Sequence, residues 1–262
     1  MAEFRLEIVN AKNEIKGASC CEDFVDLVYT EEYEEGDSIR IVSSEYPIFL
    51  NLQVDEVLGE SFVYVTEDIC YTIPFGAAKL NRSPKTFAGN CHYLYVKKAP
   101  EFQVYAYKNL ALNPNDQHMA IACYPHAVAN TETRGEAVFA AQNVIDGIWA
   151  NKFHGEWPYS SWGINRQSDA ELTVEFGRTV KTDKIVLYIR ADFPHDNWWK
   201  QVTFSFSDGS FFDCPLRKTG FGQEISFPEK KIEWVKIHQL IPSEEPSPFP
   251  ALTQLEIYGV DL

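Results

Sequence analysis

Several features that would assign this chain to a common functional class are missing from its sequence. Basic residues are not in excess, since 38 Asp and Glu outnumber 23 Lys and Arg and give a formal net charge of −15. Proteins that bind nucleic acid or anionic membranes present basic surfaces, so this charge argues against both partners. No apolar run reaches the roughly 20 residues that a membrane-spanning helix needs.

Catalytic and metal-binding signatures are missing as well. The sequence contains no GxSxG, HExxH, GxxxxGK[ST] or GxGxxG pattern, so we assign no catalytic residue and favour a binding protein over an enzyme. The six cysteines form no CxxC pair, and we expect buried, reduced thiols, with a disulfide as the alternative for an exported protein. The start, MAEFRLEIVN, lacks the basic flank and apolar core of a signal peptide. It predicts a cytoplasmic protein, or a secreted one if a native signal precedes this sequence.

The residues that are present predict an all-β chain. Short runs rich in Val, Ile, Tyr and Phe are separated by Gly, Pro, Asn and Asp, and FSFSDGSFF is typical of a hairpin that turns at Asp208-Gly209. Only 137–145 and, more weakly, 114–123 look helical. The strand pattern is interrupted between Leu112 and Asn130, so we predict two β-sandwich domains in series, residues 1–120 and 127–262.

An ordered set of motifs fills the second half. AAQNVIDG is followed by a loop that closes on Trp162 and by ELTVEFG, and then come KIVLYIR, FSFSDG, EWVKI and LEIYG. This order resembles the discoidin family (coagulation factor 5/8 type C), over residues 127–262. The resemblance implies a galactose-binding-like jelly roll and, as in family-32 carbohydrate-binding modules, a non-catalytic module that binds glycan. One departure is the link from Gly147 to Trp162, which is longer than the family's and rich in aromatics.

The resemblance also implies where the ligand binds, on loops at one end of the sandwich. Two loops there, Asn151–Tyr159 and Arg190–Trp199, combine aromatic faces for a sugar ring with side chains that bond hydroxyls. Alternatively, Arg190 pairs with an acid, and at least one residue of the pair Trp198 and Trp199 packs in the core. The predicted ligand-binding residues are His154, Trp157, Tyr159, Arg190, His195, Asn197 and Trp198, with Phe249 as a weaker candidate.

Two kinds of cation site are considered. The resemblance implies a structural Ca²⁺ held by Asp146 and Glu256, which would fasten the loop after Asp146 to the last strand. The alternative is that Asp146 caps a turn and Glu256 is an exposed strand residue. Separately, residues 22–37 contain eight acids and no Lys or Arg. They form either a loop that binds a cation or a basic partner or, the interpretation we favour, a solvated loop between strands.

Three functions follow from these observations. The first is a non-catalytic carbohydrate-binding protein. The second is a scaffold for protein–protein interaction, because Trp, Tyr and Arg also dominate protein interfaces. The third is a hydrolase or lyase acting on glycan, which needs two carboxylates about 5–10 Å apart in the N-terminal domain or the cleft between domains. The sequence leaves the particular glycan and the oligomeric state open.

Overall fold

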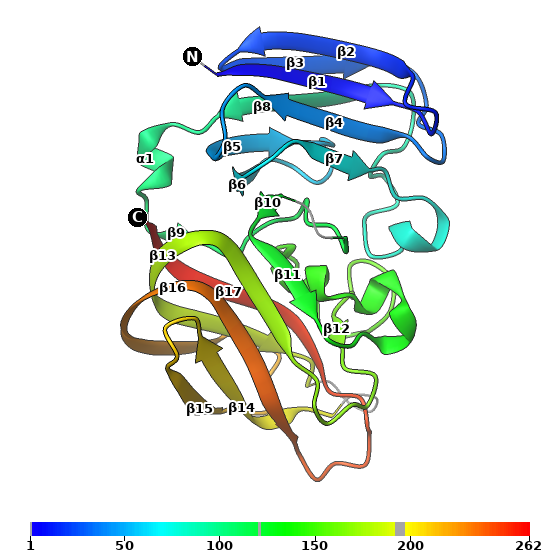
Figure 1. Cartoon of the computed structure of the whole chain (residues 1–262). Helices are drawn as coiled ribbons and strands as arrows, with labels where there is room; N and C mark the ends of the chain where they lie inside the picture. Colours follow the sequence, from blue (N-terminus) through cyan, green and yellow to red (C-terminus); the bar gives the residue numbers. More distant parts are fainter. Residues whose placement is uncertain (1, 120–121, 192–196) are drawn as a thin grey trace.

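The chain builds two β-rich halves around two hydrophobic cores. The computed structural model describes residues 2–119, 122–191 and 197–262, and nearly all of its regular structure is strand, which confirms the all-β prediction. Buried apolar side chains of residues 2–123 form one cluster, and those of residues 110–257 form the other. Figure 1 shows the first half as the blue and cyan strands and the second as the yellow to red strands.

The N-terminal half has two antiparallel sheets, with strand orders β2-β1-β4-β7 and β10-β6-β5-β8-β3. Alternation places apolar side chains on the core face, as in SIRIVS of β4, where every second residue is buried. The strands are β1 (Glu3–Val9), β2 (Ile15–Glu22), β3 (Phe24–Tyr29), β4 (Ser38–Ser43), β5 (Ile48–Gln53), β6 (Ser61–Val65), β7 (Ile69–Thr72), β8 (His92–Lys98) and β10 (Cys123–Tyr124).

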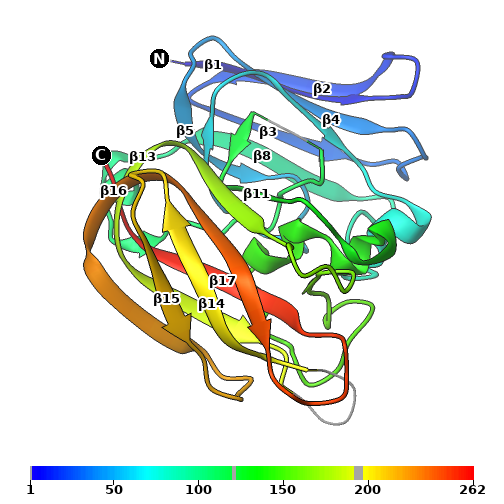
Figure 2. The same ribbon diagram turned by 60° about the horizontal axis from the view of Figure 1, so that its bottom comes forward.

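The C-terminal half is one eight-stranded sheet that folds into two layers. Two long strands, β13 (Leu172–Ile189) and β16 (Gln223–Pro242), pass from one layer into the other, and Figure 2 shows their curvature. The irregular register between Glu175 and Val180 of β13 marks the bend. The other strands are β9 (Lys108–Asn109), β11 (His126–Ala129), β12 (Trp162–Gly163), β14 (Trp199–Phe206), β15 (Phe211–Pro215) and β17 (Ala251–Asp261).

The helices are short. The predicted helix over 137–145 forms two 3₁₀ turns, η3 (Ala137–Phe139) and η4 (Ala141–Ile145). The weaker expectation for 114–123 was wrong, since the described residues of that segment contain no helix. The pattern also missed η1 (Gly76–Lys79), α1 (Glu101–Val104) and η2 (Thr133–Gly135). No helix in the described ranges is long and apolar enough to cross a membrane.

The segment between the halves pairs with both. β9 adds to β17 of the C-terminal sheet, and β10, later in the chain, adds to β6 of the N-terminal sheet. Side chains join the halves as well, because Asn81 Nδ2 donates to Asn143 Oδ1 over 2.8 Å. The division into 1–120 and 127–262 stays a prediction, and the strand pairings show that the connection is interlocked.

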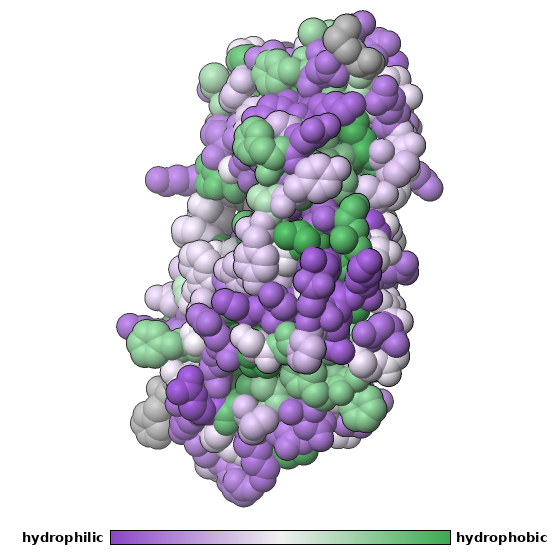
Figure 3. All heavy atoms as spheres, turned by 90° about the vertical axis from the view of Figure 1, so that its left-hand side faces the viewer, coloured by the Kyte–Doolittle hydropathy of each residue, from purple (hydrophilic) through white to green (hydrophobic). Residues whose placement is uncertain are grey.

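The expectation that the cysteines are buried was wrong for four of the six. All six cysteines lie in described parts of the chain and none is paired, but only Cys123 and Cys214 are buried. Cys20 and Cys21 lie on β2, an edge strand whose residues are mostly exposed, and Cys70 lies on the outward face of β7. Figure 3 shows one face of the molecule, where hydrophilic residues extend over both halves and apolar residues form smaller groups among the hydrophilic ones.

Candidate functional site

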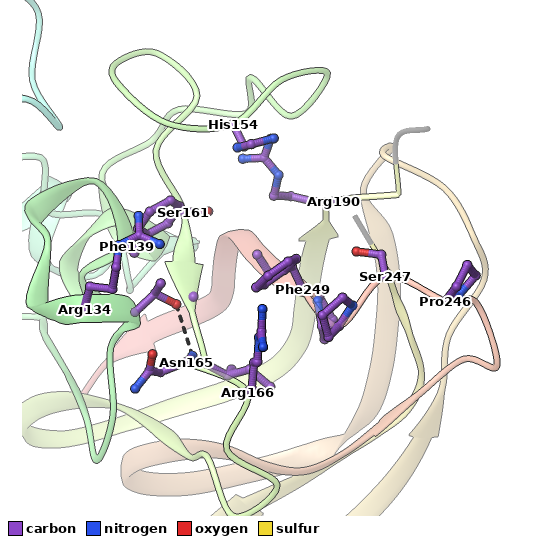
Figure 4. A pocket seen from close by; sticks show the side chains of 16 residues that line it. Arg134, Phe139, His154, Ser161, Asn165, Arg166, Arg190, Pro246, Ser247 and Phe249 are labelled. Carbon is purple, nitrogen blue, oxygen red and sulfur yellow. Dashed lines mark hydrogen bonds between the residues drawn. The ribbon is translucent and has the colours of Figure 1, made fainter. Parts of the chain in front are cut away.

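A pocket of about 470 Å³ opens among the loops at one end of the C-terminal half. Its wall comes from segments that are far apart in the sequence: the turns after β11, the loop before and after β12, the end of β13, and the Pro-rich loop before β17. Figure 4 shows how these segments surround it. The lining residues are Thr133, Arg134, Phe139, His154, Ser161, Gly163, Ile164, Asn165, Arg166, Arg190, Pro246, Ser247, Pro248, Phe249, Pro250 and Ala251.

Arg190 and His154 form one side of this pocket. Arg190 directly follows β13, is fully buried, and donates from Nη1 to the carbonyl of Tyr159 over 3.0 Å. Its backbone N–H bonds the carbonyl of Ala251, so the end of β13 positions the guanidinium. His154 is exposed, and Figure 4 shows Arg190 extending toward it. Two of the sequence-predicted ligand residues therefore line the same pocket.

Phe249 and Arg166 form the other side. The Arg166 guanidinium lies 4.6 Å from the centre of the Phe249 ring, a cation–π contact that orients both groups. Asn165 and Arg166 both have positive φ, of 49° and 61°, which turns the chain tightly after β12. The Asn165 N–H donates to Thr133 Oγ1 over 3.0 Å and holds this turn against η2. Figure 4 shows Phe249 between Arg190 and Arg166.

Gly163 allows two wall segments to approach closely. A Cβ at this position would lie 2.5 Å from Thr133 Oγ1, so only glycine fits without a shift. Beside it, Ser161 is fully buried, and its Oγ has no hydrogen-bond partner among the described residues. The pocket thus combines cationic and hydroxyl groups with the aromatic rings of Phe139 and Phe249.

Other predicted ligand residues have different surroundings. Asn197 is buried and binds the loop before β17, donating to the carbonyls of Ser243 and Glu245 over 3.3 Å each. Trp198 is half-buried, and its Nε1 donates to Glu245 Oε1, whereas Trp199 lies fully in the core. These observations match the expectation that one Trp of the pair is a core residue.

Trp157, Tyr159 and His195 complete the predicted set. The Trp157 ring is partly exposed but does not line the pocket, and the backbone N–H of Trp157 donates to the carbonyl of Leu80 in the N-terminal half. Tyr159 supports the pocket through its carbonyl, which accepts from Arg190. His195 lies outside the described residues. Sequence reasoning missed Arg134, Asn165 and Arg166, because no motif relates those positions to the loop at Phe249.

The two carboxylates predicted to hold Ca²⁺ belong to segments that contact each other, the turn at Asp146 and the strand β17 that carries Glu256. Asp146 Oδ1 accepts the Ile148 N–H over 2.8 Å and so caps a turn, as the alternative expected. Glu256 is buried rather than exposed, and its oxygens accept from Trp149 Nε1 (2.7 Å) and the Tyr258 hydroxyl (3.0 Å). Burial raises the pKa of Asp146 to about 8. Carboxylate oxygens such as these are the type of ligand that Ca²⁺ takes.

Comparisons with known proteins gave one family model and several solved structures. A family model described as a domain of unknown function (DUF7402) matches residues 119–244. A search of curated proteins found no match. One similar solved structure is chitosan-binding module 1 of a chitosanase/glucanase from Paenibacillus sp. IK-5, at 18% identity and a TM-score of 0.40, covering 58% of this chain and 98% of that one.

Two further structures are similar. The family 32 carbohydrate-binding module of NanJ from C. perfringens, in complex with galactose, has 18% identity and a TM-score of 0.38, covering 50% of this chain and 91% of that one. The lectin domain of lectinolysin, complexed with Lewis B antigen, has 17% identity and a TM-score of 0.41, covering 58% and 96%. These identities are low, and the sugars named are ligands of those proteins.

Proposed function

We propose that this protein binds glycan, without catalysis, in the pocket between Arg190 and Phe249. The observation that carries the proposal is the composition of that pocket. An aromatic ring, Phe249, lies beside the planar donor Arg166 and near the imidazole of His154, and the fully buried Arg190 lines the pocket with them. A sugar offers an apolar C–H face and a rim of hydroxyls, which such a ring and such donors match.

The size of the pocket and its position among loops also support binding of a small ligand. The volume of about 470 Å³ lies within the roughly 300–1,000 Å³ of typical small-molecule sites. The walls are loops carried on a rigid sandwich, which is where binding residues concentrate. Such a site buries little surface, so we expect a dissociation constant on the order of 0.1–1 mM.

The bound Ca²⁺ implied by the resemblance is part of this proposal as a structural element. Asp146 and Glu256 would hold it and so fix the loop after η4 against β17. The loop is also joined to β17 directly, since the Gly147 N–H donates to Gln254 Oε1 over 3.3 Å. We therefore expect the ion to stabilise the loop rather than to contact the sugar.

A glycan array with the full-length chain tests the proposal. Neutral and acidic glycans should be included, because arginines line the pocket, and the array should be run with Ca²⁺ and with a chelator. For any glycan bound, Phe249→Ala should weaken binding at least about fivefold, since truncating a central aromatic anchor costs more than about 1 kcal/mol.

Two matched variants sharpen the result. Phe221→Ala removes a more exposed phenylalanine, 83% accessible, from a loop that does not line the pocket, and should leave binding unchanged. Trp157→Ala should also bind normally if the pocket is the site. A folded protein that binds no glycan would contradict the proposal, and a protein ligand would then be sought. Loss of binding in Trp157→Ala alone would move the site to the aromatic loop 151–159.

A further inference from the structure

A second cluster of chemically active side chains lies in the N-terminal half, away from the glycan pocket. Among the residues that the structure describes, one group of three His, Cys, Asp or Glu side chains is close enough to share an ion: Asp55, Glu56 and His92. One ligand atom from each lies within 4.8 Å of the others. Asp55 and His92 are 1% exposed, and Glu56 is exposed.

Strand pairing brings these residues together. Asp55 and Glu56 follow the end of β5, and His92 begins β8, which runs antiparallel beside β5. Glu56 Oε2 accepts the Tyr93 N–H over 3.4 Å, which continues the contact beyond the last paired residues. The pairing of β5 with β8 thus places His92 beside the turn that carries Asp55 and Glu56.

The hydrogen bond made by His92 determines which ring nitrogen is free to bind an ion. Nε2 lies 2.9 Å from the carbonyl oxygen of Gly89. A carbonyl only accepts, so Nε2 carries the proton and Nδ1 has the lone pair. Nδ1 is buried and has no hydrogen-bond partner within the described ranges. A histidine that donates one N–H to a backbone carbonyl and leaves the other nitrogen unprotonated is oriented as metal-binding histidines are.

The surroundings hold the other groups in place. Asp55 accepts backbone N–H groups from Val57 (2.8 Å) and Phe87 (2.6 Å), which orients its carboxylate. The Tyr33 ring packs on the His92 ring with centroids 4.2 Å apart. The Tyr33 hydroxyl is a second buried atom here without a hydrogen-bond partner among the described residues. Preoriented ligands beside unsatisfied polar atoms point to a group that binds between them.

We propose that Asp55, Glu56 and His92 bind a divalent transition-metal ion, with Zn²⁺ as the best match. An imidazole ligand favours Zn²⁺ and its neighbours over Ca²⁺ and Mg²⁺, which prefer oxygen alone. Three protein ligands leave a fourth tetrahedral position for water or a ligand. The proposal is independent of glycan binding.

The acidic stretch 22–37 is not one loop, because it includes β3; its acid-rich part, residues 30–37 between β3 and β4, is called the acidic loop and adds a favourable field. Tyr33, which covers His92, belongs to that loop, and the surrounding acids Glu31, Glu32, Glu34 and Glu35 are exposed. Negative charge gathered near a site attracts cations and raises their local concentration. The run of acids thus lies beside the proposed ligands, although none of the four is itself one of them.

Zn²⁺ binding to the full-length, tag-free, chelator-stripped chain tests this inference. Competition with a chromophoric chelator gives affinity, elemental analysis gives stoichiometry, and Co²⁺ absorption reports the coordination geometry. We expect one Zn²⁺ per chain. Glu56→Gln, at an exposed position that should not disturb folding, should weaken binding at least about tenfold. Glu233→Gln removes the same charge from an exposed site on β16 and should bind as the unaltered chain does.

The outcomes separate clearly. Stoichiometric binding that is weakened by Glu56→Gln and lost in a folded Asp55→Asn variant supports the site. No stoichiometric Zn²⁺, or equal affinity in Glu56→Gln and Glu233→Gln, overturns it. Displacement of Zn²⁺ by millimolar Ca²⁺ would overturn the assignment to a transition metal. Unchanged glycan binding in Glu56→Gln keeps this result distinct from the proposed function.

Discussion

The buried carboxylate of Asp261 offers a sharp test of how the two halves are joined. Its side chain is fully buried near the end of β17. Oδ1 accepts from Arg178 Nε over 2.6 Å, and Oδ2 lies 2.7 Å from Lys108 Nζ. Both cations are themselves mostly buried, at 9% and 20% side-chain exposure. One carboxylate therefore neutralises two cations that have little access to water.

The same cations face the N-terminal sheet. The Arg178 guanidinium lies 5.0 Å from the ring centres of both Phe49 and Tyr64, and Lys108 Nζ lies 4.5 Å from that of Phe62. These rings belong to β5 and β6. The ion cluster of the C-terminal half is thus packed against aromatic side chains of the other half.

Replacing Asp261 with Asn should be strongly destabilising. The substitution keeps the size of the side chain but leaves two mostly buried positive charges near each other, whose other hydrogen bonds go to neutral backbone carbonyls. Removing one partner of a buried ion pair typically costs about 3–5 kcal/mol. Burial already lowers the pKa of Lys108 and of Arg178, so loss of the Lys108 proton would limit the cost to the lower part of that range.

Urea unfolding followed by tryptophan fluorescence measures this effect. We expect Asp261→Asn to lower the free energy of unfolding by about 3 kcal/mol. Asp169→Asn, an exposed Asp in the same half, should change it by less than about 0.5 kcal/mol. Adding Arg178→Met and Lys108→Met to Asp261→Asn should recover much of the loss, because the uncompensated charges are gone. Equal stabilities for Asp261→Asn and Asp169→Asn would refute the reasoning.

Three further predictions concern other parts of the chain. Because the folded pKa of Asp146, about 8, lies above its ordinary value of 3.8, its contribution to stability is full below pH about 4 and is lost as the pH rises toward 8. At pH 8 with a chelator present, Asp146→Asn should therefore have a free energy of unfolding at least about 1 kcal/mol higher than that of the unaltered chain. This figure is discounted because Asp146 is half-buried. If the difference in free energy of unfolding between the two proteins is the same at pH 4 and pH 8, the prediction is contradicted. Gly177→Ala should be destabilised by more than about 2 kcal/mol in thermal unfolding, since φ is +66° and a Cβ would lie 2.3 Å from the Tyr124 ring. Gly209→Ala, with positive φ but open space, is its control and should cost less. In a thiol titration of the folded protein, four cysteines should react quickly and Cys123 and Cys214 only on unfolding; six fast thiols would contradict the burial.

Local sequence patterns predicted the local structure well. The hairpin at Asp208-Gly209 is confirmed, with β14 and β15 paired on either side and Gly209 at a φ of 82°. Trp162 is fully buried, as its place at the end of the loop indicated. The helical pattern at 137–145 gave the right position, and the helices that form there are 3₁₀ rather than α. A segment this short does not sustain α-helical turns unless tertiary packing stabilises them.

The candidate sites were predicted less completely. His154, Arg190 and the weaker candidate Phe249 line one pocket, but Arg166, which contacts Phe249, was not predicted. Asn197 is of a residue type that binds sugar hydroxyls, yet its amide group donates hydrogen bonds to the loop before β17. Composition identifies side chains able to bind a sugar, whereas the hydrogen bonds that already occupy them depend on the folded neighbours.

The sequence by itself determined that this chain is all-β and strongly acidic, because alternation of side chains and net charge are properties of the chain alone. Only the tertiary structure decided which residues meet. Arg190 and Phe249 line one pocket although they are 59 positions apart in the sequence, and Asp55 and His92 lie together although they are 37 positions apart. Such meetings depend on strand register and on loop packing, which no local pattern encodes.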